Sequence, residues 1–503
     1  MKYTEQDPAR GSPDPSEVRS DLGRRAARGG VVTAIGQLLR VAVQAVGVVI
    51  MARILVPADF GLIAMVTAIV GVGEILRDFG LAAAAVQAPE LSTRQRSNLF
   101  WLNTAFGFAV GAGVFLMSWP IADLYGDDRL TAVTQVIAST FLFNGIASQY
   151  RASLQRELKF TWLVMAELVG LTLAVGAGIA GGLLGWGYWA LVAQYTLFPV
   201  VFVVELMIAS KWLPRGFYRR QNTRHFVRFG WHVMAYQLLT YASKNVDSVA
   251  IGMRFGAAPL GFYNRAFQLL TVPLNQVANP LMRVAVPVLA KVQENAEKFN
   301  VFLAKGQSAL LAGMLFVLLS LGALSEPAVE ILLGSEWGPT AGIFRILAIA
   351  GVFQILSFPS LWAFLALGLT RVNLIQALIT RPLLILLVIV AAFFSVESVA
   401  VAYAVGTAIS WPVALIFLSR SSDVEVLPLL KSSLRILFVN IVASLVAFST
   451  QTWIPAGNAW ISLGIGISVM GGTLAICVAA VPSLRREYAS VLGSIRGAVR
   501  KAG

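Results

Sequence analysis

The sequence predicts an all-α, polytopic membrane protein with about fourteen transmembrane helices. Of its 503 residues, 57% are hydrophobic and only 13% are charged, whereas soluble domains carry about 25% charged residues. Mean hydropathy is +0.75. Apolar runs of about 20 residues, each long enough to cross ~30 Å of hydrocarbon, recur along the whole chain. These three observations exclude an ordinary soluble protein.

Turn-forming residues divide the apolar runs and set the limits of each predicted helix. Examples are Pro57–Asp59, Tyr125–Asp128 and Gly185–Gly187, whose proline, glycine and aspartate residues favour turns. In chain order, we predict transmembrane helices at residues 29–52, 60–77, 97–119, 130–150, 160–184, 187–208, 230–251, 258–280, 302–324, 341–366, 372–396, 398–419, 433–450 and 459–480.

The distribution of Lys and Arg residues predicts the orientation of these helices. If the N-terminus is cytoplasmic, the outer loops hold only Arg53, Arg129 and Arg254. This agrees with the positive-inside rule and places both termini in the cytoplasm. The net charge of +14 therefore reflects orientation and contact with anionic lipid heads, and it predicts no nucleic-acid partner. Tryptophan residues near span ends are expected to anchor the helices at the membrane surface: Trp101, Trp119, Trp212 and Trp337.

A weak internal repeat with a spacing of about 200 residues predicts two lobes of parallel topology. Gly30 and Gly230 each open a helix, and Gly61 and Gly261 each lie near the start of the next one. Chance similarity between apolar helices is the alternative. The predicted parts are a disordered cytoplasmic tail (1–28), an N-lobe (29–208), a basic cytoplasmic linker (209–229), a C-lobe (230–420), two accessory helices (421–480) and a basic cytoplasmic tail (481–503).

Five basic side chains fall inside predicted spans, where an uncompensated charge is costly. A cation at the bilayer centre costs about 2.5–3.5 kcal/mol on insertion scales. The five residues are Arg40, Lys244, Arg265, Arg345 and Arg381. Because few acidic residues lie at similar depth, we predict that these cations line a cavity and bind an anionic cargo. The alternative for each is a structural ion pair or a side chain that reaches the membrane surface.

Acidic residues inside the spans raise two further questions. Asp247 lies three residues after Lys244, on the same helix face. It forms either an intrahelical ion pair that lets both residues enter the membrane, or a proton or cation site that couples ion binding to transport. Glu167 lies deep in the fifth span and needs a partner that the sequence does not identify. The single cysteine, Cys477, excludes an internal disulfide and a multi-cysteine metal site, and we predict no metal and no cofactor.

Several short segments, in a fixed order and spacing, match a known pattern. They are Leu55–Gly61, Gly187–Val192, Asn245–Gly252, Gly256–Ala266, Pro280–Pro287 and Leu333–Pro339. Together, over roughly residues 25–480, they resemble the polysaccharide transporter family. These are the Wzx-type flippases of the multidrug/oligosaccharidyl-lipid/polysaccharide exporter superfamily. The segments are similar to the branch that includes colanic-acid and teichuronic-acid flippases.

The resemblance implies a function and a cell location. It implies two lobes that alternate access to a central cavity and move an undecaprenyl-pyrophosphate-linked oligosaccharide from the inner to the outer leaflet. The membrane would be the cytoplasmic membrane of a bacterium, and the product an exopolysaccharide, O-antigen or capsule. The implied partners are the lipid-linked substrate, membrane lipids, a polysaccharide polymerase and a chain-length regulator.

Other classes of membrane protein fit the residues less well. A cation-coupled multidrug exporter of the same superfamily is the main alternative, but its cavity should be rich in acidic residues. A fourteen-helix major facilitator places its two extra helices between its halves, whereas here they follow the second half. A membrane enzyme is disfavoured because the chain has no Asp-x-Asp metal motif and no large outer loop.

Overall fold

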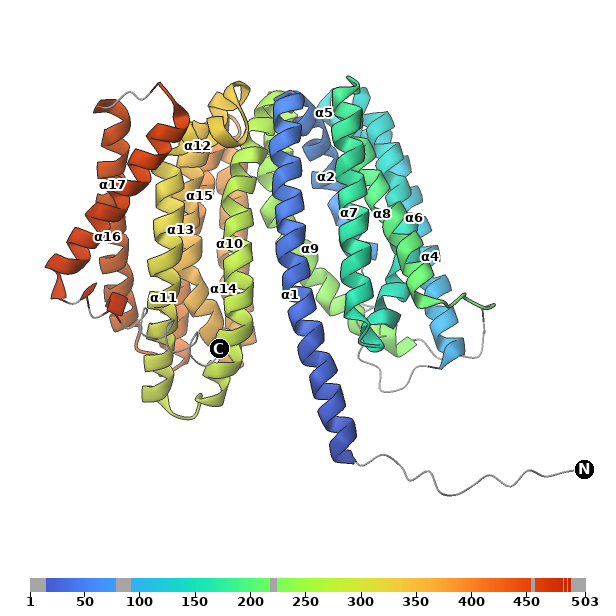
Figure 1. Ribbon diagram of the computed structural model, residues 1–503, viewed down its shortest axis with the longest axis horizontal. Helices are drawn as coiled ribbons and strands as arrows, with labels where there is room; N and C mark the ends of the chain where they lie inside the picture. Colours follow the sequence, from blue (N-terminus) through green and yellow to red (C-terminus); the bar gives the residue numbers. More distant parts are fainter. Residues whose placement is uncertain are drawn as a thin grey trace, which may run out of the picture. The chain divides into compact units, whose positions relative to one another are not determined.

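The protein is all-α in the part of the chain that the structure describes. The computed structural model describes residues 15–77, 92–217, 224–453, 457–482, 484–485 and 487–489, which are helices joined by short connections and contain no β-strand (Figure 1). Within these residues, twelve helices are long and apolar enough to cross a membrane. The protein is therefore a multi-pass membrane protein, as its hydropathy predicts.

Every predicted span lies mostly within an observed helix, although the span at 372–396 runs past the end of its helix at Ala391. The helices are α1 (Pro15–Ile54), α2 (Pro57–Arg77), α4 (Thr93–Leu116), α5 (Ser118–Tyr125), α6 (Arg129–Arg156), α7 (Phe160–Leu183), α8 (Tyr188–Ser210), α9 (Arg224–Phe255), α10 (Ala257–Lys291), α11 (Ala296–Ala323), α12 (Ser325–Leu332), the 3-10 turn η1 (Ser335–Trp337), α13 (Gly338–Ala366), α14 (Thr370–Ala391), α15 (Val396–Ser421), α16 (Val426–Trp453) and α17 (Ala459–Ala480). The spans predicted at 230–251 and 258–280 lie in α9 and α10, which are not among the twelve. The total of fourteen stays a prediction.

Helix α1 corrects the predicted N-terminal tail. It begins at Pro15, so residues 15–28 are helical rather than disordered. This stretch contains four Arg and two Ala residues, which favour helix even without a buried face. Helix α9 likewise begins at Arg224, inside the segment predicted as a linker. Two eight-residue helices, α5 and α12, occupy segments that the sequence presents as span ends or loops.

The chain folds as two compact units. Unit 1 comprises Met1–Ile54, Val70–Asp123 and Asp127–Leu238; unit 2 comprises Leu55–Ile69, Leu124–Gly126 and Leu239–Gly503. Helices α2 and α9 therefore contribute residues to both units. The predicted lobe limits, 29–208 and 230–420, stay predictions.

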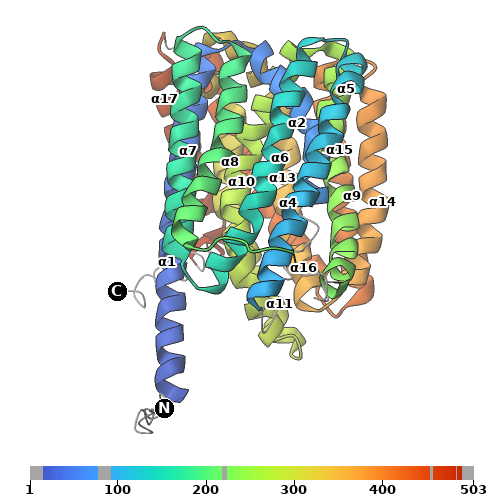
Figure 2. The ribbon, with the colours of Figure 1, turned by 90° about the vertical axis from the view of Figure 1, so that its right-hand side faces the viewer.

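Unit 1 is a layer of neighbouring helices in the order α1, α7, α8, α6, α4 (Figure 2). Small residues bring the helices close. A methyl group at Gly107 would meet the Phe141 carbonyl oxygen at 2.6 Å, and one at Gly145 would meet the Asn103 carbonyl oxygen at 2.7 Å. Such close backbone approach is typical of helix packing in membranes.

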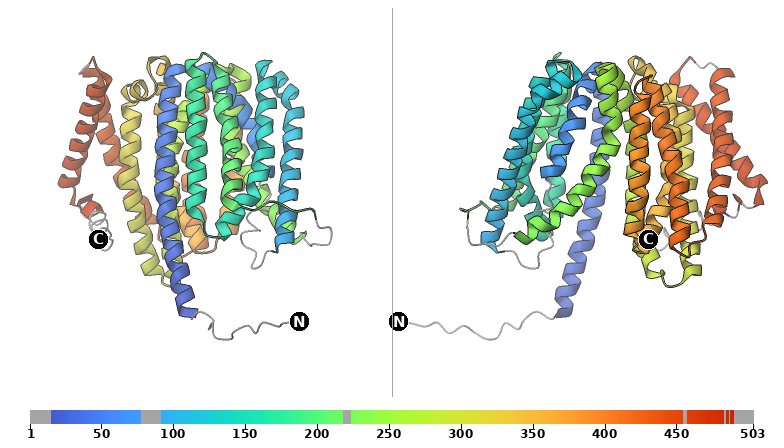
Figure 3. Two further views of the ribbon diagram at one scale, coloured as in Figure 1. Left: turned by 45° about the vertical axis from the view of Figure 1, so that its right-hand side comes forward. Right: turned by 180° about the vertical axis from the view of Figure 1, so that it is seen from behind.

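Unit 2 repeats this order of neighbours. Helices α11, α13, α15 and α14 pack in sequence, as α4, α6, α8 and α7 do in unit 1 (Figure 3). In both units a short helix, α5 or α12, follows the first of the four. Helices α16 and α17 pack against the α11 side of unit 2. Buried polar contacts hold them there; for example, the Gln307 amide donates to the Leu429 carbonyl oxygen over 2.9 Å.

Three segments of the family pattern meet inside unit 2. A methyl group at Gly61 would overlap the Ala257 carbonyl oxygen, and one at Gly261 would overlap the Pro57 carbonyl oxygen. At this crossing of α2 and α10, Gly61 packs on Ala257 and Gly261 packs on Pro57. The two contacts are therefore equivalent under a shift of 200 residues.

An aromatic cluster beside the crossing includes the third segment. The Trp337 ring contacts Phe60 and Phe262 edge-on, with centroids 5.3 and 6.1 Å apart. Trp337 is 0% exposed, so its predicted role as a surface anchor was wrong. The tight helix crossing buries this ring although it lies near a span end.

Candidate functional site

The predicted site residues Arg40, Lys244, Asp247 and Arg381 fall in two clusters of polar and charged side chains, one in each unit. The unit 1 cluster contains Arg40, Arg151 and Glu167. The unit 2 cluster contains Ser243, Lys244, Asp247, Tyr263, Gln354, Arg381 and Tyr403. The predicted cations Arg265 and Arg345 lie elsewhere in unit 2, each with partners of its own.

A glycine seam between α1 and α7 positions the unit 1 cluster. Methyl groups at Gly29, Gly36 and Gly47 would clash with side chains along α7, so these glycines permit close contact. Gly36 faces Val164. Arg40 and Glu167 lie about one turn further along their parallel helices, and therefore meet on the same side of the seam.

Glu167 is shared by two arginines. Its carboxylate accepts a hydrogen bond of 2.8 Å from Arg151 on α6 and lies 3.7 Å from the Arg40 guanidinium on α1. The side chains of Arg40 and Arg151 are 38% and 49% exposed. The partner that the sequence could not identify for Glu167 is thus a pair of cations, and the cluster keeps one uncompensated positive charge.

Two cations lie close together in unit 2. Arg381 on α14 donates a hydrogen bond of 2.8 Å to the Ser243 hydroxyl on α9, and its charge repels that of the adjacent Lys244. Among the described residues, neither cation forms an ion pair. Lys244 is exposed and Arg381 is half-buried, so both remain accessible to a ligand. Holding like charges together costs free energy that an anion would recover.

Asp247 is buried one turn further along α9. It is 1% exposed and accepts hydrogen bonds of 2.7 Å from the Tyr263 hydroxyl and from the Ser248 backbone N–H. It makes no ion pair with Lys244, so the intrahelical pair is absent. Tyr403 lies near enough to Asp247 to interact with its carboxylate electrostatically. The Tyr403 hydroxyl accepts a hydrogen bond from the Gln354 amide.

Arg265 is enclosed by protein. It is 9% exposed, lies 3.9 Å from the centre of the Phe60 ring, and donates to the Gln268 amide oxygen. A cation over an aromatic face is stabilised by the ring quadrupole. This environment explains how the charge is tolerated, and the predicted contact of Arg265 with a cargo stays a prediction.

Arg345 has a structural partner near the surface. It donates a hydrogen bond of 2.9 Å to Glu326, which is 75% exposed, and lies 5.0 Å from the Phe448 ring centre. Both the ion pair and the access to water match the structural alternative given for this residue. Its role in binding stays a prediction.

The surface pair of Asp127 and Arg129 provides a reference outside the clusters. The guanidinium donates hydrogen bonds of 2.7 and 2.9 Å to the two carboxylate oxygens. The Arg129 hydrogen bonds hold the pKa of Asp127 below its usual range. This pair lies at the start of α6, away from Arg151 at the other end of the helix.

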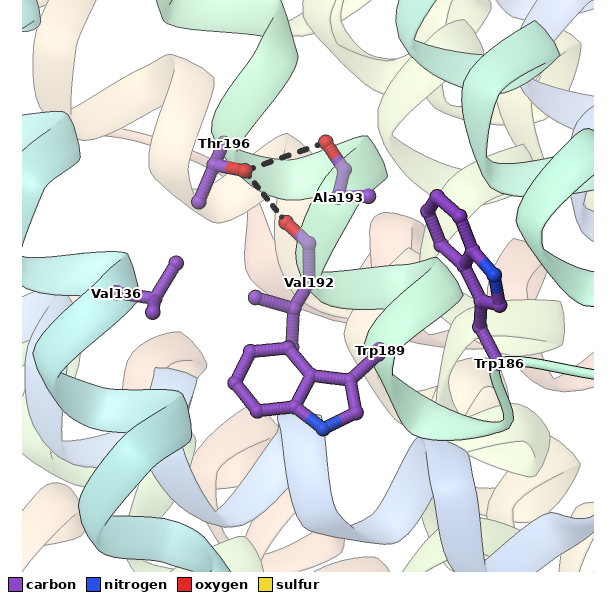
Figure 4. Close-up of a pocket in the computed structure, with 6 residues that line it drawn as sticks. All are labelled: Val136, Trp186, Trp189, Val192, Ala193 and Thr196. Atoms are coloured by element: carbon purple, nitrogen blue, oxygen red, sulfur yellow. Dashed lines mark hydrogen bonds between the residues drawn. The ribbon is translucent and has the colours of Figure 1, made fainter.

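An open groove of about 560 Å³ lies elsewhere on unit 1. Figure 4 shows its lining, Val136, Trp186, Trp189, Val192, Ala193 and Thr196. The Thr196 hydroxyl donates to carbonyl oxygens of its own helix, so the groove presents mainly hydrocarbon and indole rings. Because no charged residue lines it, the groove does not suit a phosphate.

Comparison with known proteins decides the family. Residues 50–342, more than half of the chain, match the family described as "Polysaccharide biosynthesis protein". The chain belongs to this family. The match includes α2, α7 and the motifs around Gly61, Gly261 and Trp337, so the sequence resemblance is confirmed.

Several curated proteins are similar to the chain. The lipopolysaccharide biosynthesis protein WzxC of Escherichia coli is 27% identical over 335 residues, which are 65% of this chain and 67% of that protein. The teichuronic acid biosynthesis protein TuaB of Bacillus subtilis is 28% identical over 59% of this chain and 62% of its own length. The succinoglycan biosynthesis transport protein ExoT of Rhizobium meliloti is 26% identical over 61% and 62%. The alignments thus span about two thirds of these relatives.

Solved structures confirm the fold of this family member. A lipid II flippase, MurJ, in an inward closed conformation superposes with a TM-score of 0.69 at 15% identity, covering 90% of this chain and 99% of that one. A MATE family multidrug resistance transporter of the MOP superfamily gives 0.58 at 16% identity, covering 81% and 98%. The predicted fold, a polytopic bundle of helices, is therefore confirmed.

The structure adds residues that sequence analysis missed. Arg151 lies at the end of a predicted span and looks like an orientation signal, while Tyr263 looks like an ordinary core aromatic. Ser243 and Tyr403 are uncharged, so nothing in the sequence marks them as site residues. Only the missing partner of Glu167 signalled that a cation from another helix was required.

Proposed function

We propose that this protein is a flippase and not an enzyme. It moves an undecaprenyl-pyrophosphate-linked oligosaccharide repeat unit across the cytoplasmic membrane by alternating access, for synthesis of an exopolysaccharide, O-antigen or capsule. Family membership and the names of the relatives support polysaccharide export, and the transporter fold supports movement of a cargo rather than its chemical conversion.

The observation that carries the proposal is the Lys244 and Arg381 pair. A multidrug exporter for cationic compounds needs acidic groups in its binding region, because opposite charges attract. Here two cations lie side by side, and among the described residues neither forms an ion pair, not even with the nearby Asp247. A pyrophosphate supplies the missing negative charge, and charged hydrogen bonds to it are about twice as strong as neutral ones.

A protein path solves the physical problem of moving such a lipid. Each sugar hydroxyl that loses water without a replacement hydrogen bond costs several kcal/mol, and a charged pyrophosphate costs more. Polar groups on the protein replace the lost water contacts of the head group, while the polyprenyl chain stays in hydrocarbon. The cations of both units are suited to the pyrophosphate, and neutral polar residues to the sugar.

Asp247 is proposed as the coupling residue. A buried carboxylate without a cation is costly when ionised, so proton binding changes the stability of the surrounding packing. Tyr263 and Ser248 donate to the ionised form, and this lets both protonation states exist. Uptake or release of a proton here would bias the conformational equilibrium.

The cell location and partners follow from the function. The protein is proposed to lie in the inner membrane of a bacterium with both termini in the cytoplasm. Its partners would be a polysaccharide polymerase and a chain-length regulator, which act on the repeat unit after it reaches the outer leaflet.

The experiment is complementation of a strain that lacks the gene. Wild-type protein should restore the surface polysaccharide, and Lys244→Ala should restore little at equal protein level. Loss of one charge-assisted contact costs about 1.5–3 kcal/mol, or about 10- to 150-fold in occupancy. Arg129→Ala is the matched control, since it removes a cation that already has a carboxylate partner.

Two results would reject the flippase. One is normal polysaccharide in the deletion strain. The other is full export by Lys244→Ala together with loss of resistance to a cationic drug in the deletion strain. The second result would favour the multidrug exporter.

A further inference from the structure

We propose that Glu167 is a resident counterion. Its carboxylate holds Arg40 and Arg151 while no cargo is bound, and a pyrophosphate takes its place when cargo binds. The inference rests on the proposed function, because it supposes a cargo with a pyrophosphate. It adds Arg151 and Glu167 to the residues that handle this group.

Most hydrogen-bond donors of the two arginines are unused. Arg151 donates one hydrogen bond to Glu167. Arg40 makes none within the described residues, since its nearest carboxylate oxygen is 3.7 Å away. An arginine carries five N–H donors in a planar fork that matches phosphate oxygens bidentately. The exposed fractions of 38% and 49% leave both forks open to a ligand.

The charges of the cluster favour exchange. Two cations share one carboxylate, so each is only partly neutralised. A pyrophosphate offers more anionic oxygens than a carboxylate and can engage both arginines together. When the cargo leaves, Glu167 pairs with them again. This return lowers the free energy of the empty state and prevents the cargo from being held too tightly for release.

A purely structural role explains these contacts less well. The helices α1 and α7 are already held together by close packing at Gly29, Gly36 and Gly47, so an ion pair is not needed to join them. A structural pair would also be balanced, with one cation for one acid. The excess cation and the open geometry at Arg40 are features of a ligand site.

The test measures binding of a short probe to purified full-length protein in lipid nanodiscs. The probe is farnesyl pyrophosphate, and farnesol is the uncharged control. Arg40→Ala and Arg151→Ala should each weaken binding of farnesyl pyrophosphate about tenfold or more. Glu167→Gln should tighten it about threefold or more, because the competing carboxylate is gone while the side-chain shape is kept.

Asp127→Asn is the matched control for Glu167→Gln. It makes the same change in net charge next to a different arginine, Arg129, in the same unit, and should leave binding unchanged. Glu167→Gln should also slow polysaccharide export despite tighter binding, because release becomes slower. A merely structural Glu167 would instead lower the yield of folded protein without tightening binding.

The outcomes separate the inference from the proposed function. If wild-type protein supports export but Glu167→Gln binds the probe no more tightly than Asp127→Asn, the counterion is overturned and the flippase stands. If wild-type protein neither supports export nor prefers farnesyl pyrophosphate over farnesol, the proposed function fails. Should Glu167→Gln fold poorly, Glu167→Asp tests the same point. The shorter carboxylate of Asp reaches Arg40 less well and competes less with the probe. Farnesyl pyrophosphate should therefore bind Glu167→Asp more tightly than wild type, though by less than the roughly threefold change expected for Glu167→Gln. Unchanged affinity for the probe would overturn the counterion.

Discussion

Asp247 shows how a charged residue is kept inside this protein without an ion pair. Its carboxylate is buried against Tyr263, and Phe267 stacks on the Tyr263 ring with centroids 6.1 Å apart. The charged groups nearby are Lys244 on its own helix and Arg381 on α14; the titratable hydroxyls are Tyr263 on α10 and Tyr403 on α15. A group so enclosed changes its interactions strongly when it gains a proton, which is what a coupling residue requires.

Asp247→Asn tests this coupling role. The amide keeps the size of the side chain and one acceptor for Tyr263, but it cannot titrate. Export should fall about tenfold or more, which corresponds to ~1.4 kcal/mol or more in the rate-limiting step. The residual export should no longer respond to a protonophore. The measurement is polysaccharide release with and without protonophore, and Tyr263→Phe, which keeps the carboxylate, should retain the response. A variant with wild-type export and an unchanged protonophore response would exclude Asp247 from coupling.

The chemistry of these residues is predictable from sequence, but their partners are not. Arg40, Lys244 and Arg381 stand out because a charge in the membrane is costly. Whether Lys244 meets Asp247 or Arg381 depends on how α9 is rotated and packed, which a single helix pattern does not specify. Glu167 is an example of both. The sequence shows that this carboxylate, deep in a predicted span, needs a cation, but it does not show which cation pairs with it.

Helix crossings at glycine are the main feature at the scale of elements. Gly61 and Gly261 allow the starts of α2 and α10 to touch backbone to backbone. The same crossing brings Phe60 against Trp337 and under Arg265. The family pattern around these residues therefore reflects packing more than contact with a cargo.

Gly61→Ala should destabilise the protein severely. The added methyl group would overlap the Ala257 carbonyl oxygen, and relief requires movement of backbone rather than of a flexible side chain. The expected loss is about 3 kcal/mol or more, at the upper end for single substitutions, seen as a lower thermal midpoint in detergent.

Gly113→Ala is the control for this substitution. No atom lies within 4 Å of a methyl group at Gly113 in α4, so it should be neutral or stabilise by up to about 1 kcal/mol through helix propensity. Equal thermal midpoints for the two variants would show that the crossing is not rigid.

The sequence predicts the long apolar helices correctly, because their length and hydropathy identify them. It does not predict the short helices. Each of the fourteen predicted segments lies mostly in a helix because each apolar run is long. The short helices α5 and α12 were missed because eight residues give too few turns for a periodic pattern. Helix α10 carries Asn264, Arg265, Gln268, Asn275 and Gln276, and these lower its mean hydropathy below that of the next helix, α11.

At the scale of the whole molecule, fold and function rest on different observations. The fold follows from the superposition with a known structure and from the equal order of neighbours in the two units. The proposed cargo follows from charge. Lys244 and Arg381 form no ion pair within the described residues, and Glu167 is shared by two arginines. Composition alone predicted the membrane location, whereas the contacts were needed to find where the charges are uncompensated.

The most direct measurement locates the lipid-linked repeat units in cells depleted of this protein. Intact spheroplasts are treated with a membrane-impermeant reagent that oxidises and labels sugars, and the labelled fraction of undecaprenyl-linked oligosaccharide is compared with that in disrupted cells. If the protein is the flippase, depletion should leave the repeat units in the inner leaflet, so most should be labelled only after disruption, and wild-type protein should reverse this. Repeat units that accumulate in the outer leaflet, fully labelled in intact spheroplasts, would contradict the account, because they would place the defect after translocation.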